Sequence, residues 1–161
     1  GMIDFKIFIK NSNAPVNSLS NLGSEFTFWE NTEEYSSSFD KDYIEGALVI
    51  ELYGSEIIGL DYYDLIDQLL VYYIEALNNL RLKGTAEFSF PDQPLKVSIK
   101  DLRNGKVELR VGEKSINADK REFTDKLLRT SKVFFEHLEN NFELNYDFIL
   151  NKINTEISYW Q

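Results

Sequence analysis

Apolar and polar residues alternate along residues 85–118, and this alternation constrains the fold more than any other feature of the sequence. A period of two puts every second side chain on one face of a β-strand, so the segment predicts strands with one buried and one solvated face. Short Pro-Asp-Gln-Pro and Arg-Asn-Gly connections predict that these strands form an antiparallel β-meander. Its apolar face would carry Ala86, Phe88, Phe90, Leu95, Val97, Ile99, Val107, Leu109 and Val111.

The turn at 103–105 determines the register of the two strands that it joins. A two-residue Asn-Gly turn would set Ile99 opposite Arg110 and mix apolar and charged side chains on one face. A three-residue loop with a left-handed Gly105, built as a type I turn with a bulge, keeps them apart. We therefore predict the second register, which pairs Ile99 with Leu109, Val97 with Val111 and Lys100 with Glu108.

Three segments before residue 60 predict further strands. Residues 2–10 alternate between apolar and polar, and residues 25–30 form a second, shorter candidate. Residues 47–53 are almost all apolar, which predicts a central strand covered on both faces. The acidic and serine-rich stretch 31–42 predicts an exposed loop.

Apolar residues spaced three and four apart predict helices over 60–80, 119–141 and 146–160. Asp61 is expected to cap the first helix and Gly84 to end it. Asp119, followed three residues later by Glu122, forms a capping-box pattern at the second. That helix would bury Phe123, Leu127, Phe134 and Leu138. The segment 146–160 is either a third helix or a kinked extension of the second.

The order of these elements predicts an α+β fold. We expect one domain over residues 1–161, with a mainly antiparallel sheet of about six strands and two or three helices packed on one face. A chain of 161 residues with 43% apolar content can bury a core of this size without disulfides.

Charge is distributed unevenly along the chain. Residues 1–80 hold 14 acidic and 3 basic residues, a net charge of −11. Residues 81–135 hold 8 acidic and 13 basic residues, a net charge of +5, and residues 136–161 hold 5 and 1, a net charge of −4. The acidic majority disfavours nucleic acid and anionic membranes and favours a basic protein as partner.

The acidic first half also carries aromatic residues where a polar surface is expected, a composition typical of protein-binding patches. The alternative is that Trp29 and Tyr72 pack beneath the loop 31–42. The candidate partner-binding residues are Trp29, Glu33, Glu34, Tyr35, Asp61, Asp64, Gln68, Tyr72 and Glu75.

A basic patch is predicted on the solvated face of the meander. Such a patch could contact phosphate or an acidic protein, but Glu108 and Glu113 lie among its cations and no exposed aromatic residue accompanies them for base stacking. We therefore do not expect nucleic acid as a partner. The patch comprises Lys96, Lys100, Arg103, Lys106 and Arg110.

No motif in the sequence indicates catalysis. Cysteine is absent, His137 is the only histidine, and neither a phosphate-binding glycine loop nor an H-E-x-x-H pair occurs. A histidine beside two phenylalanines in a helix is more often structural than catalytic. We predict no catalytic residue, no metal site and no cofactor.

The sequence shows no signal-peptide pattern and no apolar run long enough to span a bilayer. Together with the absence of cysteine, this predicts a cytoplasmic protein that does not associate with membranes.

The leading hypothesis is a non-enzymatic module that binds a basic protein. Acidic inhibitors and small bacterial immunity proteins, which neutralise toxins or nucleases, are similar in size and charge, although no residue motif connects the chain with them. One alternative is an enzyme or small-ligand protein that uses carboxylates and tyrosines in a pocket between helices and sheet. The other is a homo-oligomeric structural protein.

Overall fold

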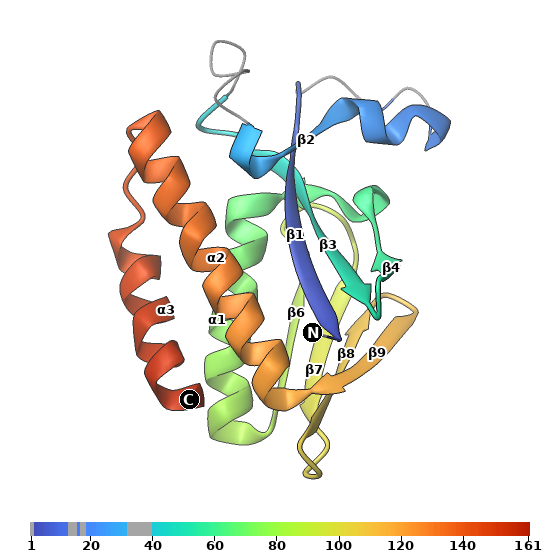
Figure 1. Ribbon diagram of the computed structural model, residues 1–161, viewed down its shortest axis with the longest axis vertical. Coiled ribbons are helices and arrows are strands. Elements are labelled where there is room, and N and C mark those ends of the chain that lie inside the picture. The colour runs from blue at the N-terminus through green and yellow to red at the C-terminus, as the bar shows by residue number, and fades with distance from the viewer. Residues whose placement is uncertain (1, 13–15, 17–18, 32–39) are drawn as a thin grey trace.

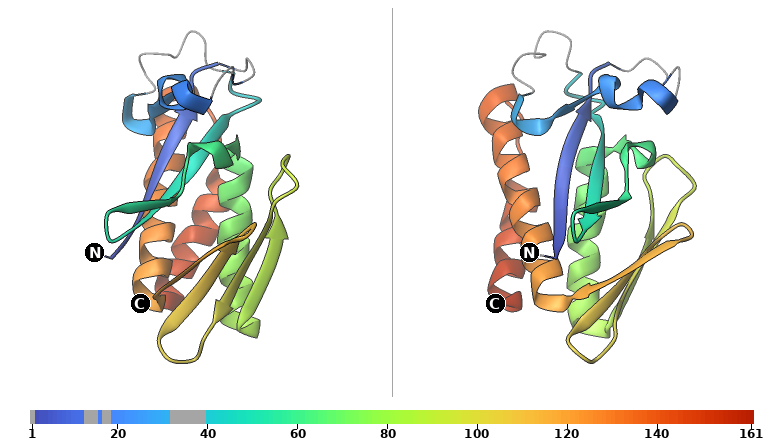
Figure 2. Two further views of the ribbon diagram at one scale, coloured as in Figure 1. Left: turned by 90° about the vertical axis from the view of Figure 1, so that its right-hand side faces the viewer. Right: turned by 45° about the vertical axis from the view of Figure 1, so that its right-hand side comes forward.

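The structure, a computed structural model, describes residues 2–12, 16, 19–31 and 40–161. It has an α+β fold with two antiparallel sheets and three α-helices, which confirms the predicted class (Figure 1). The strands form a five-stranded and a four-stranded sheet, whereas the sequence predicted one sheet of about six strands. Figures 1 and 2 show the three helices gathered on one side of both sheets.

The first sheet has the order β2-β1-β3-β4, and β5 pairs with one end of β3. Its central strand is buried on both faces, as predicted: Leu48 and Ile50 join the main core, while Ala47 and Val49 join a smaller cluster on the opposite face. The strands are β1 (Ile3–Lys10), β2 (Phe26–Phe28), β3 (Glu45–Leu52), β4 (Ser55–Ile58) and β5 (Asp64–Leu65). A 3₁₀ helix, η1 (Leu19–Glu25), precedes β2.

The second sheet is the predicted meander, in the order β6-β7-β8-β9. Its strands are β6 (Thr85–Ser89), β7 (Lys96–Asp101), β8 (Lys106–Val111) and β9 (Lys114–Asp119). The predicted register is confirmed, with Ile99 opposite Leu109 and Lys100 opposite Glu108. Gly105 is left-handed, with φ of 83°, but Arg103 also has a positive φ of 67°, so the turn is not the predicted type I.

Helix α1 (Ile66–Lys83) begins six residues later than the apolar spacing indicated. A 3₁₀ turn, η3 (Leu60–Tyr62), and the strand β5 occupy the intervening residues. The pairing of Asp64 with Gly46 takes this segment into the first sheet, so Asp61 caps no α-helix. Gly84 ends α1 as predicted, with φ of 79° and its N–H donated to the carbonyl of Leu80.

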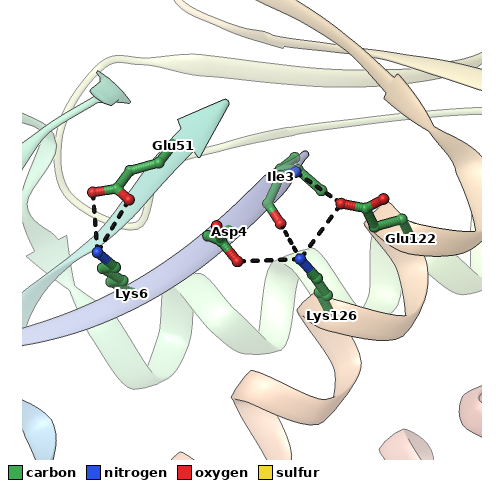
Figure 3. A network of polar contacts seen from close by, with 6 residues as sticks. All are labelled: Ile3, Asp4, Lys6, Glu51, Glu122 and Lys126. Atoms are coloured by element: carbon green, nitrogen blue, oxygen red, sulfur yellow. Dashed lines mark hydrogen bonds and ion pairs between the residues drawn. The ribbon is translucent and has the colours of Figure 1, made fainter. Parts of the chain in front are cut away.

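Helix α2 (Lys120–Phe142) begins as predicted, because the side chain of Asp119 accepts the N–H of Glu122. The Glu122 carboxylate extends to β1, where it accepts the N–H of Ile3 at 2.8 Å (Figure 3). Lys126 donates to the Ile3 carbonyl and to Asp4 in the same network. These contacts attach the beginning of α2 to the beginning of the chain.

A left-handed Glu143, with φ of 56°, ends α2, and α3 (Asp147–Trp160) follows as a separate helix. One buried cluster contains residues from both sheets and all three helices. It includes the four α2 residues predicted to be buried, Phe123, Leu127, Phe134 and Leu138.

Candidate functional site

An acidic pocket lies where three segments of the chain meet. They are the start of β3, the η3–β5 segment and the loop between β6 and β7. The pocket has a volume of about 360 Å³ and contains four carboxylates. We call it the acidic pocket, and its lining residues are Glu45, Asp61, Tyr63, Asp64, Asp92 and Gln93.

Asp64 is buried below the pocket and connects two of the segments that line it. Its side chain is buried, with 3% exposed, and it accepts the backbone N–H groups of Asp92 at 3.1 Å and Gln93 at 2.8 Å. The Gln93 side chain donates in turn to the carbonyl of Tyr63. These bonds connect β5 to the β6–β7 loop, so Asp64 positions the pocket while the other carboxylates face the solvent more openly.

Negative charge is concentrated around the pocket. Burial raises the pKa of Glu45; Lys10, 3.9 Å away, partly offsets this effect, while Asp92 and Asp64 raise the pKa further. The charge of Asp92 also raises the pKa of Tyr43, whose hydroxyl donates to Asp92 at 3.4 Å. A negative potential stabilises the protonated form of both carboxyls and phenols, so the contributions of Asp92 and Asp64 to these shifts, apart from the effect of burial, are consistent with a preference for a cation.

The pocket suits an organic cation. Carboxylates accept hydrogen bonds from an ammonium or a guanidinium group, and the ring of Tyr63, which lines the pocket, can stack on a planar guanidinium. Tyr63 already lies 5.9 Å from the Lys10 ammonium, measured to the ring centroid. In the described part of the chain, no three Asp, Glu or His side chains are grouped so that they could hold a metal ion.

Of the candidate partner-binding residues that the structure describes, Asp61 and Asp64 are the two that come together in this pocket. Tyr72 and Glu75 lie further along α1, beside β6, and Gln68 is exposed near its start. Glu33, Glu34 and Tyr35 fall outside the described residues.

The ring of Trp29 packs against other rings at the far end of the first sheet, whereas most of the loop 31–42 lies outside the described residues. The ring centroid lies 5.0 Å from that of His137 and 6.5 Å from that of Phe134. His137 thus contacts aromatic residues, and its Nδ1 also lies 3.1 Å from Asn141. The ring contacts of Trp29 connect the segment before the loop 31–42 to the last part of α2.

The sequence did not single out four of the six residues that line the pocket: Glu45, Tyr63, Asp92 and Gln93. Glu45 opens a buried strand, and Asp92 lies in a hairpin loop, so each carboxylate lies at the end of a strand. A carboxylate at a strand end is the one feature of the sequence that could have identified these residues. The sequence does not show that the two strand ends meet. Their convergence depends on the packing of the two sheets.

All five residues of the basic patch are exposed, as predicted, and four of them lie on β7 and β8. Acidic residues separate them. Glu108 binds Arg110 at 3.0 Å, and Glu87 shares the same outer face. The face therefore has mixed charge.

A second cavity, of about 370 Å³, lies between α1 and α3. Its floor is an ion pair between Arg81 and the buried Glu156, 2.9 Å apart, and the ring of Tyr159 covers the guanidinium at 3.8 Å. Lys152 and Glu75 pair at its rim, 3.5 Å apart. Because each charged side chain that lines this cavity already forms an ion pair within the chain, the cavity is less suited to a charged ligand than the acidic pocket is.

A tyrosine and a carboxylate also meet between α1 and α3. The Tyr146 hydroxyl donates to Asp67 at 3.0 Å, and burial raises the pKa of both groups. The pair links the beginnings of the two helices.

Within the described residues, no helix has the length and apolar character needed to cross a membrane. Comparison of the chain with protein-family models, curated proteins and solved structures found no match in any of the three.

Proposed function

We propose that this chain is a non-enzymatic protein-binding module whose acidic pocket receives a lysine or arginine side chain of a basic partner. The observation that carries the proposal is the convergence of Glu45, Asp61 and Asp92 on one cavity lined by a tyrosine. A basic toxin or nuclease is the kind of partner that such an inhibitor-like module would neutralise.

The distribution of charge would attract a basic partner before contact as well as bind it after contact. The pocket lies within the acidic first half, except for the loop that contributes Asp92. A field of one sign accelerates the approach of an oppositely charged protein, and the effect decreases as salt screens it. Arginine fits better than lysine, since its planar group can bind two carboxylates and stack on Tyr63.

The test uses two blocked tripeptides, acetyl-Gly-Arg-Gly-amide and acetyl-Gly-Gln-Gly-amide, as probes of the pocket. Binding is followed by the NMR shifts of the backbone amides of Asp92 and Gln93. We expect the arginine peptide to shift these amides and the glutamine peptide to leave them in place. Raising the salt from low to high concentration should weaken the arginine peptide's binding.

Variants connect the binding to the pocket. Asp92→Asn removes one exposed carboxylate and should weaken binding of the arginine peptide about two- to fivefold, the range for a solvent-exposed charge pair. The matched control is Glu136→Gln, which removes an exposed carboxylate from α2. Equal loss in both variants, or equal binding of the glutamine peptide, would contradict the proposal.

A further inference from the structure

The second sheet has an open edge at β6. In Figure 2, β6 is the outermost strand of this sheet. It pairs with β7 along one edge, and no described strand pairs with its other edge. The Phe90 N–H donates to the Leu95 carbonyl, and the Asp101 N–H to the Gly84 carbonyl. In an antiparallel pair, the hydrogen-bonded residues alternate, so the even-numbered residues of β6 bond to β7.

The odd-numbered residues Thr85, Glu87 and Ser89 therefore direct their backbone N–H and C=O groups away from the sheet. All three residues are exposed. Among the described residues, no hydrogen bond reaches these outward backbone groups. The edge thus presents the bonding pattern that an added strand would complete.

The other sheet edges are shorter or approached by another element. Strand β2 has three residues and β4 has four. Strand β9 lies beside β4, where the Lys114 ammonium donates to the carbonyl of Ile57 at 3.1 Å. Residues 85–89 contain no lysine, proline or bulge, the usual means of blocking an edge, and carry Glu87 as their only charge.

A small cavity accompanies this edge. It has a volume of about 80 Å³ and lies between α1 and β6, with Tyr72, Ala76 and Phe88 as its apolar walls. Glu75 and Glu87 line it as well. Successive side chains of a strand point to opposite faces, so this cavity on the α1 side would receive a side chain of an added strand that is adjacent in sequence to the one opposite Glu87.

We propose that β6 accepts an extended segment of a partner protein as a fifth strand, with a lysine or arginine of that segment opposite Glu87. Backbone bonds to Thr85, Glu87 and Ser89 would hold the segment, and the Glu87 carboxylate would select its basic residue. This site is separate from the acidic pocket and does not depend on it.

A second copy of the chain fits this edge less well. The antiparallel register that pairs all five residues of β6 with those of another β6 sets Glu87 directly opposite its counterpart. Like charges facing each other across a strand pair are destabilising. The charge of the edge therefore favours a basic segment over self-association.

The first experiment uses two blocked heptapeptides of sequence Thr-Val-Thr-X-Thr-Val-Thr, with X either lysine or glutamate. We expect the lysine peptide to slow amide hydrogen exchange at Glu87 and Ser89, and to bind about two- to fivefold more tightly than the glutamate peptide. Glu87→Lys should reverse that preference. An unchanged preference in Glu87→Lys would overturn the proposal.

A second pair of variants tests the backbone bonds. Glu87→Pro removes one outward N–H, which β7 does not use, so the sheet should tolerate it while losing detectable peptide binding. The matched control is Asn117→Pro, at an exposed outward position of the opposite edge strand β9, which should bind normally. Normal binding to Glu87→Pro, or loss in both variants, would refute strand addition.

A third measurement needs no variant of the protein. N-methylation of the peptide amides on one edge of the strand should abolish binding, whereas methylation of the opposite set should leave one bonding edge intact and retain it. Equal binding of the two methylated peptides would exclude pairing along β6. Asp92→Asn should leave binding at β6 unchanged, which separates this site from the acidic pocket.

Discussion

Replacing Asp64 with asparagine tests whether this buried carboxylate holds the acidic pocket together. The carboxylate accepts N–H groups from Asp92 and Gln93, 28 and 29 residues away. Both groups bind the same carboxylate oxygen, and the other oxygen accepts the N–H of Leu65 at 2.7 Å. An asparagine of the same shape has only one oxygen, so its NH₂ group would face either Leu65 or this pair of donors. The substitution loses one charge-assisted bond, worth about 1.5–3 kcal/mol, and leaves a buried N–H without an acceptor, at a cost of about 1–3 kcal/mol.

We therefore expect Asp64→Asn to lower the free energy of unfolding by roughly 3 kcal/mol, a large part of the total for a domain of this size. Urea titration at pH 7, followed by circular dichroism, measures this change. Hydrogen exchange should also accelerate at the amides that bond to this side chain, those of Leu65, Asp92 and Gln93. The control Asp61→Asn removes an exposed carboxylate from the same pocket and should stay within about 0.5 kcal/mol of the wild type. A loss below about 1 kcal/mol in Asp64→Asn would refute the positioning role.

Three further predictions concern the fold. Phe134→Ala empties a fully buried site and should cost about 3–5 kcal/mol in urea titration, with a shift in Trp29 fluorescence; a loss below about 1 kcal/mol would contradict this assignment. Gly84→Ala places a side chain at φ of 79° and should lower stability by about 1 kcal/mol, and no change in melting temperature would exclude strain there. The N–H of Ile3 lowers the pKa of Glu122, so the stability from this carboxylate is complete above its ordinary pKa of 4.5 and is lost as the pH falls through the lower folded value. Glu122→Gln should therefore reduce stability at pH 7 more than at pH 3, and equal losses would contradict this linkage.

Local patterns predicted most of the elements and one of their registers. The Ile99–Leu109 pairing followed from keeping apolar and charged residues on opposite faces, a condition that the sheet satisfies. Asp119 was identified as a cap because its bond to Glu122 spans only three residues. Where a bond joins neighbours in the sequence, the sequence is sufficient to predict it.

The start of α1 was mispredicted because a distant strand competes for its residues. Asp64 and Leu65 pair with β3, and Ile66 donates its N–H to the carbonyl of Ile44. Helical spacing in the side chains carries no information about such a partner. The same limit explains why the strands were expected in one sheet, since alternation identifies a buried face without showing what covers it.

The sequence by itself determined the fold class, the meander with its register, the helix caps at Asp119 and Gly84, and the imbalance of charge between the two halves. These features arise from the alternation of side chains and from bonds over a few residues, which any folded form of the chain must satisfy. Tertiary structure alone decided that Glu45, Asp61 and Asp92 share a pocket, that Asp64 is buried beneath it, and that β6 remains an open edge. Such features depend on which distant segments pack together, and that is settled by the burial of the whole core rather than by any short stretch of sequence.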